Sequence, residues 1–173
     1  MTSLRVPAAV AAVALALVLQ VTLFPHLAWQ GVVPNLCLLV VVGAALTRGP
    51  QFAAVLGFAA GVVLDLAPPA DHAAGRWALA LVVVGYVAGR VRPEHGQRPS
   101  ATTVVATVAA SSFVGTSVYA LTGLMLQDPA VGVGDLLQVI AISVVWDVLL
   151  TPLVLPLVMG MFRRLEPDRV ALS

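Results

Sequence analysis

Residues 57–66 read GFAAGVVLDL, and this stretch indicates the fold class more clearly than any other part of the chain. Gly57 and Gly61 are four residues apart, so they share one helical face and let a neighbouring helix approach closely. The stretch is otherwise apolar until Asp65, whose carboxylate would be rare and costly inside a bilayer. Two interpretations of Asp65 stay open: a functional group, or a side chain that reaches the outer headgroups.

The composition of the whole chain points to lipid as its solvent. Hydrophobic residues make up 60% of the 173 residues, charged residues make up 10%, and the mean hydropathy is +1.02. A soluble domain of this size could not bury so much apolar surface, so we expect an all-α integral membrane protein. The net charge of +1 argues against a nucleic-acid partner, and the single cysteine, Cys37, argues against a disulfide framework.

Prolines, glycines and charged residues divide the chain into six apolar segments. We expect these to be the transmembrane helices of a single polytopic domain, residues 1–173, at about 6–24, 32–47, 51–66, 73–89, 101–126 and 136–162. A spanning helix needs roughly 20 residues, so the three middle segments are short, and a thinned bilayer or partial re-entry would accommodate them. The first segment ends at a poor cleavage site, so we expect a retained helix rather than a signal peptide.

The arginines predict the orientation of these six helices. All nine basic residues are arginine, and eight of them fall on one side when the N-terminus is placed in the cytoplasm. Only Arg76 then lies outside. Because basic residues concentrate in cytoplasmic loops, we expect a multi-pass membrane protein with both termini in the cytoplasm.

Small residues recur at helical spacing in the third and fourth segments. We predict that they form a helix-packing or partner surface consisting of Ala53, Gly57, Gly61, Gly85 and Gly89. A tightly packed bundle is the first interpretation of such ridges, and a ligand groove is the second.

Asp147 is the deepest acid in the predicted helices. It lies about eleven residues into the sixth segment, roughly 16 Å from its start and therefore near mid-membrane. Asp147, with Trp146 beside it, is a candidate polar or ligand-facing group; the alternative is a structural clasp to a neighbouring helix. The two acids lack the residues that frame a membrane aspartyl peptidase, and no metal or nucleophile motif occurs, so we expect no catalytic, metal or cofactor site.

Several short motifs, taken in order, resemble the rod shape-determining protein MreD family. Pro34 and Asn35 open the second segment as the family's Pro-(Asn/Asp)-apolar signature does. Residues 57–66 are similar to its Gly-Phe-x-x-Gly-x-x-x-Asp-Leu block, and residues 75–86 to the segment that follows. The end of the chain is similar as well, with Trp146-Asp147, Pro152 and the basic run 162–164.

This resemblance implies a non-enzymatic, multi-pass component of the bacterial inner membrane that belongs to the cell-wall elongation complex and is involved in cell shape and in organising lateral peptidoglycan synthesis. It also implies association with MreC and, through it, with MreB and the elongation peptidoglycan synthases, in contact with membrane lipids. The family is similar in fold to the substrate-binding components of energy-coupling-factor vitamin transporters. The alternative function is therefore a small-molecule-binding subunit of such a transporter, although the short outer loops and few aromatic residues speak against it.

Overall fold

The chain folds as a bundle of α-helices. The structure is a computed structural model that describes residues 5–68, 73–93, 97–126 and 133–164. In chain order its elements are α1 (Arg5–Thr22), the short 3-10 helix η2 (Phe24–Leu27), α2 (Leu36–Arg48), α3 (Pro50–Leu66), α4 (Arg76–Arg90), α5 (Ala101–Met125) and α6 (Val133–Arg164). The described residues contain no β-strand, only an isolated bridge between Trp29 and Val32. The expected all-α fold is confirmed.

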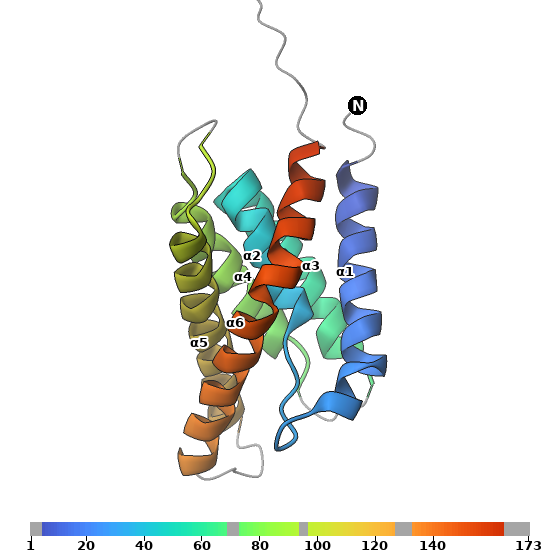
Figure 1. Cartoon of the computed structure of the whole chain (residues 1–173). Coiled ribbons are helices and arrows are strands. Elements are labelled where there is room, and N and C mark those ends of the chain that lie inside the picture. Colours follow the sequence, from blue (N-terminus) through green and yellow to red (C-terminus); the bar gives the residue numbers. More distant parts are fainter. Residues whose placement is uncertain (1–4, 69–72, 94–96, 127–132, 165–173) are drawn as a thin grey trace, which may run out of the picture.

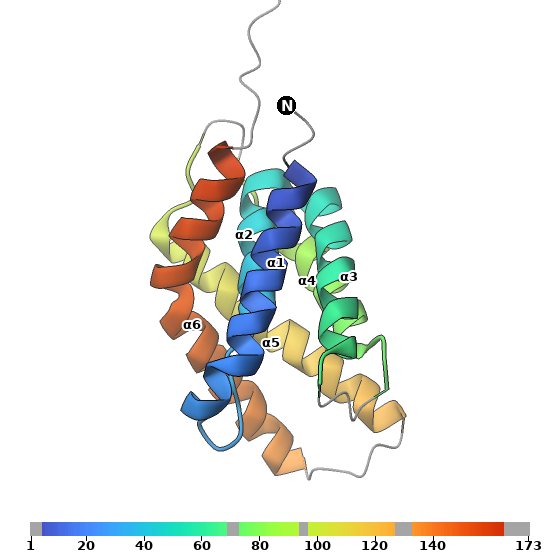
Figure 2. The same ribbon diagram turned by 90° about the vertical axis from the view of Figure 1, so that its right-hand side faces the viewer.

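α2 is the central helix of the bundle. Every residue from Leu36 to Thr47 is buried, and α2 contacts each of the other five α-helices. Figure 2 shows α1 lying across the front of α2, with α6 on one side and α3 on the other. From Leu36 to Leu46, α2 consists of leucine, valine and alanine apart from Cys37 and Gly43, and such an all-apolar sequence suits a helix that is enclosed on all sides.

α2 begins later than the sequence predicted, at Leu36 instead of near residue 32. Gln30 and Gly31 adopt positive φ angles of 51° and 80° in a tight turn, and this turn reverses the chain before the helix starts. From the turn the chain rises into the middle of the bundle, where α2 begins (Figure 1). The N-terminus of α2 is therefore inside the protein and not at its surface.

Helix lengths separate the elements into two groups. α5 and residues 134–164 of α6 are long and apolar enough to cross a membrane, whereas α1, α2 and α3 are shorter apolar helices. The 13 residues of α2 extend over only about 20 Å, against a hydrocarbon core of roughly 30 Å. The helix alone is too short to reach both surfaces, and the chain that rises from the turn to Leu36 supplies the rest of the length of this segment (Figure 1).

One end of the bundle is rich in arginine. The first turn of α1 and the last turn of α6 lie at this end, and α2 and α4 also finish there (Figures 1 and 2). We call it the arginine-rich end, and its described members include Arg48, Arg90, Arg98, Arg163 and Arg164. Arg76 opens α4 at the opposite end.

Candidate functional site

Asp147 holds the buried N-terminus of α2. Its carboxylate Oδ1 accepts a hydrogen bond from the backbone N–H of Asn35 at 2.8 Å, and its side chain is 1% exposed. Asn35 in turn caps the helix, because its Oδ1 accepts from the backbone N–H of Leu38 at 2.9 Å. The first amides of a helix have no partners within the helix, and a negative group there also interacts favourably with the helix dipole. Asp147 and Asn35 together satisfy this buried helix end; we call them the α2 anchor.

The α2 anchor joins two motifs that lie far apart in the sequence, Pro34-Asn35 and Trp146-Asp147. Of the two interpretations of Asp147, the observed geometry is that of a clasp between helices. Thr151, one turn further along α6, donates its hydroxyl to the carbonyl of Asp147 at 2.8 Å and so binds back to its own helix. A ligand-facing role for Asp147 or Trp146 stays a prediction.

Polar atoms beside the α2 anchor have unused hydrogen-bonding capacity. Ser112 of α5 is fully buried and lies next to the Asp147 carboxyl, but its hydroxyl falls outside hydrogen-bond geometry. The side-chain nitrogens of Asn35 and Trp146 are also buried, and neither has a hydrogen-bond partner in the described part of the chain. Such buried polar groups are costly when they are unpaired.

Asp65 forms the second buried polar contact and ties α3 to α4. Its two carboxylate oxygens accept from the backbone N–H groups of Gly75 (2.9 Å), Trp77 (3.0 Å) and Ala78 (3.1 Å). Gly75, the residue before α4, has a φ of 101° and no side chain with which to cap the helix itself. Asp65 is 3% exposed because it supplies this cap from α3, so its side chain does not reach towards the headgroups, and a functional role for it stays a prediction.

Arg76 follows this cap and ties α4 to α5. Its Nε and Nη2 donate to the carbonyl of Tyr119 at 3.3 and 2.9 Å, and its guanidinium lies 3.9 Å from the centre of the Tyr119 ring. Trp77 stacks on the same ring at 4.5 Å. A side chain at Gly123 would occupy the position of the Arg76 guanidinium, so a glycine at this position leaves room for that group. Arg76 is 7% exposed and is bound inside the bundle.

Sequence reasoning missed Arg76, Tyr119 and Thr151, which form these contacts, and Ser112, which lies beside Asp147. Arg76 did leave a signal, since it is the one arginine that departs from the predicted charge asymmetry. Ser112 and Tyr119 left none, because a serine or a tyrosine in an apolar helix is ordinary and their importance depends on which helix packs beside α5.

Replacing Asp65 should destabilise the protein by removing the cap of α4. For Asp65→Ala we expect a loss of about 2 kcal/mol in the free energy of unfolding, because amides of a buried helix end lose their acceptor. Asp65→Asn keeps one acceptor oxygen and should lose about half as much. Thermal unfolding of the detergent-solubilised protein measures both, and equal effects of the two variants would contradict capping as the cause.

The predicted ridge of small residues is used within the chain. A Cβ at Gly57 or Gly61 would overlap the backbone of α4 at Leu81 or Ala78. A Cβ at Gly85 or Gly89 would likewise overlap the backbone of Ala53 or Pro50. The two ridges face each other and bring the α3 and α4 backbones into direct contact. Within this chain the ridge packs α3 against α4.

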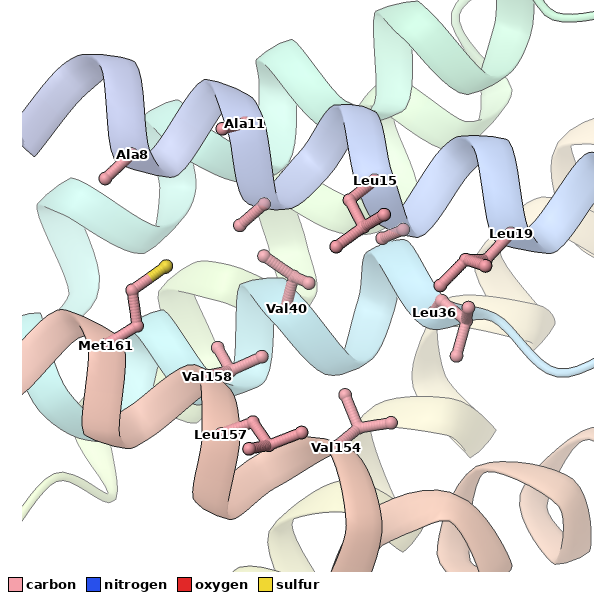
Figure 3. A pocket seen from close by; sticks show the side chains of 12 residues that line it. Ala8, Ala11, Leu15, Leu19, Leu36, Val40, Val154, Leu157, Val158 and Met161 are labelled. Atoms are coloured by element: carbon pink, nitrogen blue, oxygen red, sulfur yellow. The ribbon is translucent and has the colours of Figure 1, made fainter.

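A groove on another face of the bundle is open. It lies between α1, α2 and α6, has a volume of about 450 Å³, and is lined by apolar side chains (Figure 3). Ala8, Ala12 and Ala16 give α1 a small-residue face on the groove, and Val40 of α2 and Val158 of α6 lie opposite. We call it the α1–α6 groove.

The buried acids do not form a catalytic pair. Asp65 and Asp147 accept hydrogen bonds from the amides of two different helix ends, and a peptidase-like dyad needs two carboxyls in contact. Among the residues that the structure describes, no three His, Cys, Asp or Glu side chains gather as a metal site would require.

The fold and its buried contacts define a class of protein: a helical membrane protein in which acidic side chains hold helix ends. The family of rod shape-determining protein MreD matches residues 4–161 of the 173. The chain therefore belongs to the MreD family, which gives it a role in rod-shape determination and places it among membrane proteins rather than known enzymes. No curated protein and no solved structure matches the chain significantly.

Proposed function

We propose that this protein is a non-enzymatic, six-span component of the bacterial inner membrane that organises lateral peptidoglycan synthesis. The observation that carries the proposal is the family match over residues 4–161. In this proposal both termini are cytoplasmic, which is supported by the arginine-rich end, because basic residues concentrate on the cytoplasmic side. MreC is the direct partner, and MreB and the elongation synthases are reached through it.

The α1–α6 groove is the surface that we propose for the transmembrane helix of MreC. The glycine ridges of α3 and α4 are filled by one another, whereas this groove is open along α1. Its alanines permit close approach of a second helix, which is how helices associate in lipid. Leu15 and Leu157 stand exposed at its edges, at 61% and 70%, and offer apolar contacts beside the alanines.

Filling the groove tests this surface. Ala12→Leu places a larger side chain in the α1–α6 groove, so we expect recovery of co-expressed MreC to fall about fivefold or more, as overpacking costs upward of about 1 kcal/mol. Ala14→Leu is the matched control, since Ala14 is exposed and does not line the groove. Co-purification from membranes gives the measurement, and rescue of rod shape in cells lacking the native protein gives the functional readout.

Equal recovery of MreC with both variants, at equal expression, would reject the groove as the partner surface. Failure of the unaltered chain to recover MreC at all would reject the partner itself. The vitamin-transporter alternative has no support in the family match or in the described structure, and we do not propose it.

A further inference from the structure

A second groove is lined by apolar side chains along most of its length and by arginines at one end. It lies between the N-terminal part of α5 and the C-terminal half of α6 and has a volume of about 850 Å³. Val104, Val105, Leu155 and Met159 line its apolar part, and its mouth at the arginine-rich end is lined by Arg98, Arg163 and Arg164. We call it the α5–α6 groove. Among the residues whose side chains the structure describes, by contrast, no charged one lines the α1–α6 groove.

The charges at its mouth are not neutralised by the described part of the chain. Arg98, Arg163 and Arg164 form no salt bridge or hydrogen bond with any described residue, and Arg98 and Arg164 are exposed. The acids that the structure describes are Asp65, Asp135 and Asp147, which lie in the interior or towards the opposite end. Three cations converge on one mouth, and a phosphate or carboxylate is the kind of group that clustered arginines bind.

The N-terminus of α5 adds backbone donors at the same mouth. Ser100 caps α5 by accepting from the N–H of Thr103 at 3.0 Å, and the first intrahelical bond is donated by Val104 to the Ser100 carbonyl. The amides of Ala101 and Thr102 precede these bonds and have no acceptor among the described residues, and Ala101 lines the groove. A helix N-terminus with neighbouring arginines is a favourable site for a phosphate group.

The length of the groove suits an acyl chain. Along α6 its lining extends from Arg164 to Val148, roughly 24 Å, whereas one leaflet of hydrocarbon is about 15 Å deep. Pro152 and Pro156 interrupt the hydrogen bonding of α6 in this stretch, and Gly160 leaves open space where a side chain would stand. The groove therefore continues from the charged mouth into the membrane interior.

We propose that the α5–α6 groove binds an anionic phospholipid, with its phosphate among Arg98, Arg163 and the N-terminus of α5 and one acyl chain along Leu155 and Met159. Apolar contact alone would not distinguish this lipid from its neighbours, so the arginines supply the selectivity for charge. The inference rests on the membrane orientation proposed above and does not depend on MreC.

The test uses the full chain, purified in a neutral detergent, and measures lipid retention by native mass spectrometry. The probes are dioleoylphosphatidylglycerol, dioleoylphosphatidylcholine and glycerol 3-phosphate, which separate a charged lipid, an uncharged lipid and a free phosphate. We expect phosphatidylglycerol to bind at least about tenfold more tightly than either of the others, since each arginine near a membrane surface contributes roughly fivefold.

Two variants examine the two halves of the groove. Arg98→Gln/Arg163→Gln should weaken phosphatidylglycerol binding about tenfold or more, whereas Arg90→Gln, at the same end but outside the groove, should leave it within about twofold. Gly160→Leu places a side chain in the open space and should reduce binding by a comparable factor without disturbing the fold.

Equal binding of the two phospholipids, or binding of glycerol 3-phosphate as tight as that of phosphatidylglycerol, would overturn the proposal. An unchanged affinity in Gly160→Leu would overturn the placement of the acyl chain. MreC recovery from the same preparations is scored separately, so loss of MreC with lipid binding retained rejects the proposed partner and leaves the lipid site standing.

Discussion

Gly61→Leu should prevent α3 and α4 from packing and lower the free energy of unfolding by about 3 kcal/mol or more. The Cβ alone would overlap the backbone of Ala78, and a backbone cannot move aside as the end of a flexible side chain can. Overpacking normally costs about 1–3 kcal/mol, and the upper end applies where the obstructing atoms are backbone. Loss of folded protein after heating in detergent, followed by size-exclusion chromatography, measures the effect.

Ala59→Leu is the matched control for this experiment. Ala59 is exposed on the same helix, so an identical side chain is added where nothing opposes it. We expect its stability to remain within about 0.5 kcal/mol of the unaltered protein. If Gly61→Leu were equally harmless, the close contact between α3 and α4 would not exist in the folded protein.

Asp147→Ala should release the N-terminus of α2 and lower the free energy of unfolding by about 2–3 kcal/mol. The variant leaves the buried N–H of Asn35 without its acceptor, and an unpaired buried donor costs about 1–3 kcal/mol, with more when the lost partner is charged. Removing the carboxylate also removes the cost of keeping it in an apolar environment. That gain does not offset the loss, because α6 stays in the micelle in both the folded and the unfolded protein. Thermal unfolding and protease protection of the 28–35 loop measure it.

Asp147→Asn distinguishes hydrogen bonding from charge. The amide oxygen can still accept from the Asn35 N–H, so we expect a loss of under about 1 kcal/mol. A loss as large as that of Asp147→Ala would mean that the negative charge at the helix terminus is the dominant contribution, and our account of the α2 anchor would fail.

The α2 anchor gives a physical role to Pro34-Asn35 and Trp146-Asp147, two motifs that the sequence analysis named without relating one to the other. A short central helix starts inside the bundle, and its first amides have no water to bind. Asn35 satisfies one of these amides and Asp147 another, from a helix 112 positions further along the chain. Asn35 and Asp147 are therefore needed to satisfy the buried start of α2, and this role does not involve a ligand.

Periodicity and composition predicted the helices well and their ends less well. Apolar runs broken by proline and glycine located all six α-helices, because each helix must present apolar residues to lipid or to its neighbours. The starts of α2 and α4 were predicted about three or four residues too early. Both helices begin after a residue with positive φ or a side-chain cap, which hydropathy does not detect.

The sequence by itself determined that this chain is an all-helical membrane protein of the MreD family, since its apolar content, arginine placement and motif order depend on local residues alone. Only the tertiary structure decided what the conspicuous residues do. Gly57, Gly61 and Asp65 look like candidates for a partner or a site, yet they contact α4. The physical reason is that a glycine face or a buried acid fits a partner's helix and a neighbouring helix of the same chain equally well, and only the arrangement of the helices determines which one occupies it.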